Sequence, residues 1–167
     1  MKTTATVEAT FNCSLERAFK TPILGDATQF LVGYGPIPAV VKFTDDATWG
    51  QVGGTRIPHS AKNLASAGGP IGLDVIYSRN ENHYWQWGIA AFYQPSMGFT
   101  EFRGELFFTV IEPEVIRVRW VYNLYSQGPL TYPFHWLFTK LLWRGQMRIA
   151  IRRMKAYAES DAPFLYE

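Results

Sequence analysis

Residues 133–158 read PFHWLFTKLLWRGQMRIAIRRMKAYA, the longest helical pattern in the chain. The proline stands in the first turn, where a missing N–H costs little. Apolar residues recur at steps of three and four, which predicts one apolar face made of Phe134, Phe138, Leu141, Leu142, Gly145, Ile149 and Ala156. A separate basic face carries Lys140, Arg144, Arg148 and Lys155. Such a helix would be roughly 40 Å long, and we expect its apolar face to lie against another layer.

The composition predicts a globular chain with an unusual aromatic content. Its 167 residues are 47% hydrophobic and 18% charged, which predicts a single domain over residues 1–167. Aromatic residues reach 16% and suit either a thick core or an apolar pocket, and composition alone leaves both open. The net charge of +2 is too small to indicate a polyanionic partner, so no nucleic acid is expected. The oligomeric state is open, a homodimer included.

Cysteine use and hydropathy indicate the compartment. Cys13 is the only cysteine, which excludes an internal disulfide and favours a reducing compartment. The first eight residues lack the apolar block of a signal peptide. No run approaches the ~20 apolar residues of a membrane span. We therefore expect a cytoplasmic protein without a membrane-spanning segment.

The rest of the chain predicts short strands around two short helices. Thr4–Asn12 alternates polar and apolar residues, as a half-buried strand does. Two short helices are expected at Leu15–Lys20, ended by Pro22, and at Leu24–Leu31. Further strands are expected at Ala39–Thr44, Gly54–Ser60, Ile71–Ser78, His83–Tyr93, Phe99–Ile111 and Val115–Tyr125. Hairpin connections favour an α+β fold, in which an antiparallel sheet of about six to seven strands curves around the long C-terminal helix.

Four stretches, in this order and spacing, resemble a known superfamily. They are SLERAF at 14–19, GPIPAVV at 35–41, VGGTRI at 52–57 and RWVYNLY at 119–125. The chain resembles the START-related helix-grip superfamily (SRPBCC) over about Thr4–Glu159, and most nearly its polyketide cyclase/dehydrase-like members. Residues 57–70 and 132–136 depart from the family pattern.

The resemblance implies a helix-grip fold with a central cavity for a small hydrophobic molecule, such as a lipid, a polyketide or an aromatic compound. It does not imply catalysis, because many members only bind or carry. Two alternatives stay open. One is an enzyme of the polyketide cyclase, aromatase or dehydratase type. The other is a membrane- or partner-docking module that uses the basic face of the C-terminal helix.

Large rings on the central strands are the candidate cavity lining. The residues that we expect to line it are Trp87, Phe102, Leu106, Trp120, Tyr122, Phe138 and Leu142. The side on which Trp85 and Trp87 lie is left open, because a bulge would reverse it. Gly145 either leaves room above the sheet for a ligand or lets the helix pack closely on a bulky Trp or Phe. Arg56 matches the strand arginine of the resembled family, and its guanidinium is the candidate polar anchor for a carboxylate or enolate oxygen.

Candidates for catalysis are few. His59 and Tyr122 are the acid–base candidates, although His59 lies three residues after Arg56 and faces the opposite side of a strand unless Pro58 bends it. The three histidines are widely spaced and form no metal-binding pattern, so no metal is expected. No nucleotide fingerprint is present either, and no cofactor is expected.

Overall fold

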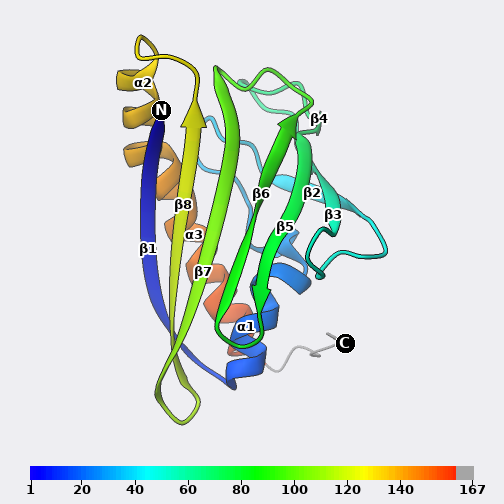
Figure 1. Cartoon of the computed structure of the whole chain (residues 1–167), viewed down its shortest axis with the longest axis vertical. Coiled ribbons are helices and arrows are strands. Elements are labelled where there is room, and N and C mark those ends of the chain that lie inside the picture. The colour runs from blue at the N-terminus through cyan, green and yellow to red at the C-terminus, as the bar shows by residue number, and fades with distance from the viewer. Residues whose placement is uncertain (161–167) are drawn as a thin grey trace.

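The computed structural model describes residues 1–160 and shows an antiparallel sheet wrapped around a C-terminal helix (Figure 1). The elements in chain order are β1 (Lys2–Asn12), α1 (Leu15–Leu24), η1 (Ala27–Gln29), β2 (Val40–Asp45), β3 (Thr55–Ser60), β4 (Gly69–Pro70), β5 (Gly72–Asn80), β6 (Tyr84–Phe92), β7 (Phe99–Glu112), β8 (Val115–Ser126), α2 (Tyr132–Leu137), η2 (Phe138–Trp143) and α3 (Arg144–Ala158). The strand order is β1-β8-β7-β6-β5-β3-β2, and the two-residue β4 pairs with β3. The predicted α+β fold and sheet are confirmed.

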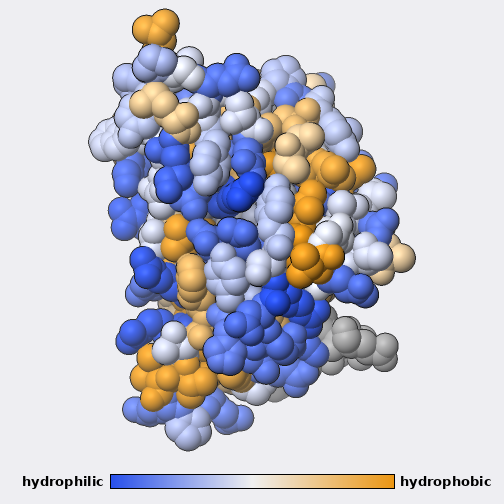
Figure 2. All heavy atoms as spheres, viewed as in Figure 1, coloured by the Kyte–Doolittle hydropathy of each residue, from blue (hydrophilic) through white to orange (hydrophobic). Residues whose placement is uncertain are grey.

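Alternation places apolar side chains on the inner face of the sheet. Leu106 lies opposite Trp120 across β7 and β8, and Phe108 lies opposite Val118, so their side chains share the core face. The outer face carries polar cross-strand contacts, such as Asn123 Nδ2 donating to Glu105 Oε2 over 3.0 Å. Figure 2 shows this outer face as largely hydrophilic, with a hydrophobic patch at its lower left.

The question left open for β6 is answered by burial. Trp85 and Trp87 both point into the interior, with 0% and 6% of their surfaces exposed. The Trp85 indole N–H donates to the carbonyl oxygen of Phe19 in α1 over 2.9 Å, and the two rings stack with centroids 4.9 Å apart. Trp85 therefore holds α1 against the sheet through a hydrogen bond and ring stacking.

The short helices differ from the prediction. Ser14 caps α1 by accepting from the Arg17 N–H, but the helix continues through Pro22 to Leu24 instead of ending before the proline. Pro22 removes one backbone hydrogen bond, and the burial of Pro22 and Ile23 offsets that loss. In place of the second expected helix, the structure has only the short 3₁₀ turn η1, which Asp26 caps through the Thr28 N–H.

The C-terminal helix contains a π-helical segment, η2, which shifts the phase of its apolar face. A π turn holds more residues than an α turn, so a pattern read at a constant 3.6-residue period rotates away from the true face. The buried side of α3 is made of Gln146, Met147, Ala150, Ile151, Met154 and Ala158. The predicted stripe through Leu141, Ile149 and Ala156 was wrong, since Leu141 and Ala156 are exposed and Ile149 is only half-buried.

The basic side of the terminal helix lies beside β1, an edge strand of the sheet. Lys140 Nζ donates to the Thr4 carbonyl oxygen over 3.2 Å, and Lys155 Nζ donates to the Thr10 carbonyl oxygen over 2.5 Å. These bonds satisfy edge carbonyl groups that have no neighbouring strand. Within residues 1–160, the helices fall short of the length and hydropathy that a bilayer-crossing segment needs.

Candidate functional site: an aromatic cavity between sheet and helix

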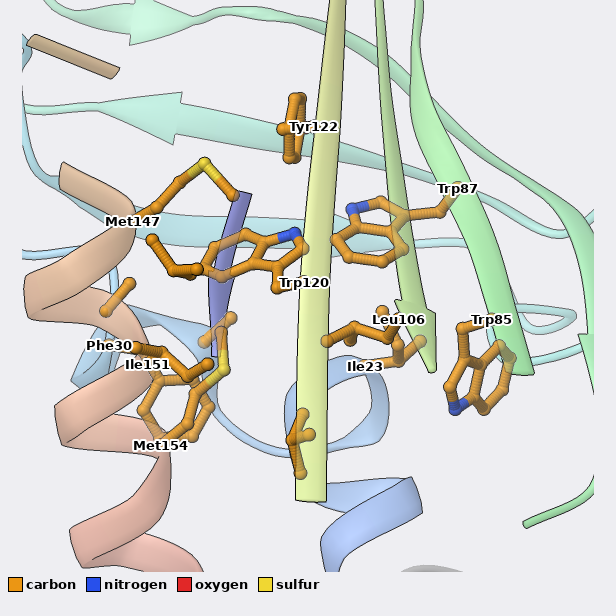
Figure 3. Close-up of a cluster of buried hydrophobic side chains, with 14 of the residues drawn as sticks. Ile23, Phe30, Trp85, Trp87, Leu106, Trp120, Tyr122, Met147, Ile151 and Met154 are labelled. Carbon is orange, nitrogen blue, oxygen red and sulfur yellow. The ribbon is translucent and has the colours of Figure 1, made fainter. Parts of the chain in front are cut away.

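A cavity of about 420 Å³ lies between the inner face of the sheet and the terminal helix. Rings from β6, β7 and β8 form one wall, and α2, η2 and α3 contribute Phe134, Phe138, Leu142, Trp143, Gln146 and Met147. Segments 36–38, 65–66 and 94–97 complete the lining from loops. Figure 3 shows Trp87 and Trp120 side by side between sheet and helix, with Tyr122 above them and Met147 extending from α3.

The rings of the wall contact one another. Trp87 and Trp120 lie nearly parallel, with an interplanar angle of 28° and centroids 6.2 Å apart. Tyr122 meets the Trp143 ring at 5.0 Å, and Phe102 meets the same ring at 4.9 Å. Trp143 therefore joins the helix to two strands. Aromatic rings held by several neighbours present a stiff apolar surface, which favours flat ligands.

Gly104 makes this arrangement of rings sterically feasible. It lies between Trp87 and Tyr122 in the cross-strand register of β6, β7 and β8. A Cβ atom at this position would lie 2.7 Å from Trp87 Cζ2 and 2.8 Å from Tyr122 Cε2. The missing side chain therefore lets both rings lean over β7 from either side.

A buried ion pair lies in the cavity wall. Arg56 on β3 and Asp74 on β5 are opposite each other in the sheet, with Arg56 Nε 3.3 Å from Asp74 Oδ2. Only 6% and 8% of the two side chains is exposed. The guanidinium lies between two rings, 4.1 Å from the centroid of Phe43 and 4.0 Å from that of Trp49. Asp74 therefore supplies a counter-charge to Arg56 from within the sheet.

Burial controls the ionisation of this pair. It raises the pKa of the Asp74 carboxyl, and the adjacent Arg56 charge opposes that rise. Burial also lowers the pKa of Arg56, opposed in turn by Asp74, although an arginine retains its proton at neutral pH. Because the two charges compensate each other, the pair offers a ligand little net charge.

Tyr122 brings a phenol to the same wall. Burial raises the pKa of Tyr122, and the negative charge of Asp74 raises it further while Arg56 lowers it. The hydroxyl is therefore protonated at neutral pH and acts as a hydrogen-bond donor, not as a base. Within residues 1–160, no hydrogen bond engages it.

Three other polar atoms in the wall have no hydrogen-bond partner among the described residues. They are the indole N–H groups of Trp120 and Trp143 and the side-chain oxygen of Gln146, all buried. A buried polar group without a partner costs free energy. Two of the three are donors, so the wall is better matched to a ligand that brings hydrogen-bond acceptors.

The structure brings most of the predicted lining residues together. The cavity is bordered by Arg56, Trp87, Phe102, Trp120, Tyr122, Phe138 and Leu142, and their binding of a ligand stays a prediction. Leu106 does not border it. Its side chain is fully buried in the core, and Figure 3 shows it near Trp85 and Ile23, below the rings of Trp87 and Trp120.

His59 also lies outside the cavity. Strand β3 keeps its alternation through Pro58, so Arg56 and Pro58 are buried while His59 remains on the outer side. There its Nε2 atom lies 3.1 Å from the Thr44 hydroxyl. From this position the His59 ring does not reach the cavity, so the structure gives no support for His59 as an acid–base group there. Within residues 1–160, no group of three or more potential metal ligands is present.

Sequence reasoning missed Asp74, Trp143 and Gln146. The sequence did contain a signal for Asp74. It lies on the same side of its strand as the buried Gly72 and Ile76, and an acid is rarely buried without a partner. The sequence contained no such signal for Trp143 and Gln146, because the π-helical segment turned them toward the cavity.

No family model matches the sequence, and no curated protein matches it. Solved structures share its fold. Ara h 8.0201 has a TM-score of 0.65 at 12% identity, covering 95% of this chain and 98% of that one. Norcoclaurine synthase from Thalictrum flavum, in complex with dopamine and hydroxybenzaldehyde, has a TM-score of 0.70 at 8% identity, covering 98% and 90%.

A third similar structure is the di-domain ARO/CYC StfQ from the steffimycin biosynthetic pathway. It has a TM-score of 0.68 at 11% identity, covering 95% of this chain and 52% of that one. At these identities the likeness shows the fold alone. The helix-grip fold predicted from the sequence is confirmed.

Proposed function

We propose that this helix-grip chain binds a small, uncharged, ring-containing molecule in the cavity between its sheet and its terminal helix. The observation that carries the proposal is the wall itself, in which aromatic rings surround about 420 Å³. Among the described residues, Arg56 and Asp74 form the only ion pair that borders this space, and their opposite charges offset each other. Pockets for small ligands commonly enclose about 300–1,000 Å³.

The polar groups of the wall support an uncharged ligand. An anionic ligand would have to compete with Asp74 for Arg56, and a cationic one would have to compete with Arg56 for Asp74. Either would add an unmatched charge to a buried site, which is costly. A carbonyl or ether oxygen, in contrast, can accept from Tyr122 or Trp143 without such a penalty.

One similar structure is consistent with a ring-containing ligand, whereas it gives no support for the absence of charge, because dopamine bears an ammonium group at neutral pH. The norcoclaurine synthase structure holds dopamine and hydroxybenzaldehyde, which are small ring compounds. That protein is only 8% identical to this chain, so its ligands indicate a class and not an identity.

A matched pair of probes tests the proposal. 2-Acetylnaphthalene and 2-naphthoate share a ring system and differ in charge, and isothermal titration calorimetry measures both. We expect the ketone to bind more tightly than the carboxylate. If neither probe binds and native mass spectrometry finds no small molecule on the purified protein, the pocket proposal fails.

Two neighbouring leucines supply matched variants. Leu142 borders the cavity, whereas Leu141 is 60% exposed. Leu142→Trp should fill part of the cavity and abolish binding of the ketone. Leu141→Trp adds the same volume outside and should leave binding unchanged.

Catalysis is the second candidate, and a specific feature favours it. The Asp74 carboxyl, whose pKa is raised by burial, and the protonated Tyr122 hydroxyl both border the cavity, and the charge of Asp74 raises the pKa of Tyr122. Such groups can exchange protons in a cyclisation or dehydration. An enzyme of this type should lose turnover on Tyr122→Phe while retaining ligand affinity, whereas a binding protein shows no turnover to lose.

A further inference from the structure

Four large apolar side chains lie exposed at the start of the terminal helix. The exposed fractions are 52% for Phe134, 48% for Trp136, 50% for Leu137 and 60% for Leu141. All four fall within α2 and η2, at the end of the molecule opposite the β7–β8 hairpin (Figure 1). Apolar residues clustered on one surface indicate an interaction site.

A row of arginines continues along the same helix. Arg144, Arg148 and Arg152 are spaced four residues apart in α3 and line a groove of about 480 Å³ against Thr6 and Glu8 of β1. Within residues 1–160, these arginines make no hydrogen bond or ion pair. Like charges four residues apart repel each other, so the row is destabilising unless an anion meets it.

Among residues 1–160, Glu8 is the one acid that lines this groove, and it already has a partner. Glu8 Oε1 lies 3.5 Å from Nε of Arg119 on the adjacent strand β8. The groove therefore keeps an excess of positive charge beside the exposed apolar cluster. Apolar side chains followed by arginines on one helix surface are the pattern of helices that lie in the interface of an anionic bilayer.

We propose that the outer surface of the terminal helix docks on an anionic lipid bilayer. The apolar side chains of α2 and η2 enter the boundary between headgroups and acyl chains, and Arg144, Arg148 and Arg152 face lipid phosphates. Phe134 belongs to the docking surface and also borders the cavity, so docking brings the cavity opening toward the bilayer. The docking surface does not depend on the ligand-binding proposal, because vesicle binding is measurable on the empty protein.

Charge argues against a second copy of the chain as the occupant. A two-fold dimer brings the same surface of both protomers together. It would place two rows of arginines close to each other, with Glu8 already paired to Arg119. An anionic bilayer instead offers many phosphates to each row.

Vesicle co-sedimentation tests the docking surface. We expect binding to vesicles in which about a third of the phosphatidylcholine is replaced by phosphatidylglycerol, little binding to phosphatidylcholine alone, and a steep loss of binding as salt is raised. Arg144→Glu with Arg148→Glu should lower the affinity roughly tenfold or more, since each basic residue near an anionic surface contributes about a fivefold factor. Leu137→Ser with Leu141→Ser should weaken binding as well.

Matched controls keep the test specific. Lys42→Glu with Arg117→Glu changes the net charge equally, on β2 and β8, and Val110→Ser with Ile111→Ser removes exposed apolar side chains from the β7–β8 hairpin. Both should bind vesicles like the wild type. The proposal is overturned if the controls lose as much binding as the test variants, or if the protein does not bind anionic vesicles. It is also overturned if the protein is a dimer and Leu137→Ser with Leu141→Ser dissociates it.

Discussion

The ring of Tyr34 lies directly on Gly145 of the terminal helix. A Cβ atom on residue 145 would approach Tyr34 Cε1 to 2.4 Å and Cζ to 2.5 Å, so only glycine accommodates this contact. Tyr34 belongs to a tight turn, in which its N–H and carbonyl groups both bond to Ile37. The turn borders the cavity through residues 36–38, so the Tyr34–Gly145 contact holds a cavity wall against the helix. Of the two roles predicted for Gly145, close packing is the one observed, but the ring belongs to a tyrosine and not to the tryptophan or phenylalanine that was expected.

Substitution of Gly145 should reveal this contact. Alanine favours the helix by about 1 kcal/mol over glycine, but the collision with Tyr34 should outweigh that gain and leave Gly145→Ala destabilised by about 1–2 kcal/mol. In a Tyr34→Ala background the same change should be stabilising. Urea unfolding of the four proteins measures the cycle, and a stabilising Gly145→Ala in the wild-type background would contradict the contact.

The Arg56–Asp74 pair predicts an asymmetric response to substitution. Asp74→Asn leaves a buried guanidinium without its counter-charge and should lower the free energy of unfolding by about 3–5 kcal/mol. Arg56→Met with Asp74→Leu removes both charges and should recover most of that loss. Glu81→Gln removes the partner of Arg79 in a more exposed pair and should cost less than about 1 kcal/mol. Equal effects of Asp74→Asn and Glu81→Gln would show that Asp74 is solvated.

Gly104 should be intolerant of a larger side chain. Gly104→Val would displace the Trp87 and Tyr122 rings, and we expect a loss of about 1–3 kcal/mol in stability together with weaker binding of 2-acetylnaphthalene. Near-ultraviolet circular dichroism reports whether the rings have moved. An unchanged aromatic spectrum with unchanged binding would show that the rings do not depend on Gly104.

Tyr122 should titrate only when the protein unfolds. Its pKa is raised above the ordinary value of 10.0, so the folded state holds the phenolic proton more tightly than the unfolded state does. The stabilisation from this group is therefore complete below about pH 10 and is lost as the pH rises toward the folded-state pKa.

Absorbance of tyrosinate measures this directly. Below about pH 11, Tyr122→Phe should leave the titration of the native protein unchanged, whereas in urea the same substitution should remove the signal of one tyrosine. A smaller native signal in Tyr122→Phe over this range would mean that Tyr122 is accessible to solvent and ionises normally.

Local periodicity was sufficient for much of the fold. The alternation in residues 99–125 predicted the β7–β8 hairpin and the shared core face of Leu106 and Trp120, because neighbours on a strand point to opposite sides whatever lies beyond them. The same rule put His59 on the opposite side from Arg56. Such patterns depend only on adjacent residues, so they can be read without the tertiary structure.

Long-range contacts decided the character of the cavity. The sequence by itself determined that an antiparallel sheet faces a long amphipathic helix, since both patterns are local. Only the tertiary structure paired Arg56 with Asp74, seated Tyr34 on Gly145 and introduced the π-helical segment that turned Trp143 toward the sheet. Each of these arises from packing between segments distant in the chain, where the shape of the partner and not the residue's own neighbours selects the arrangement.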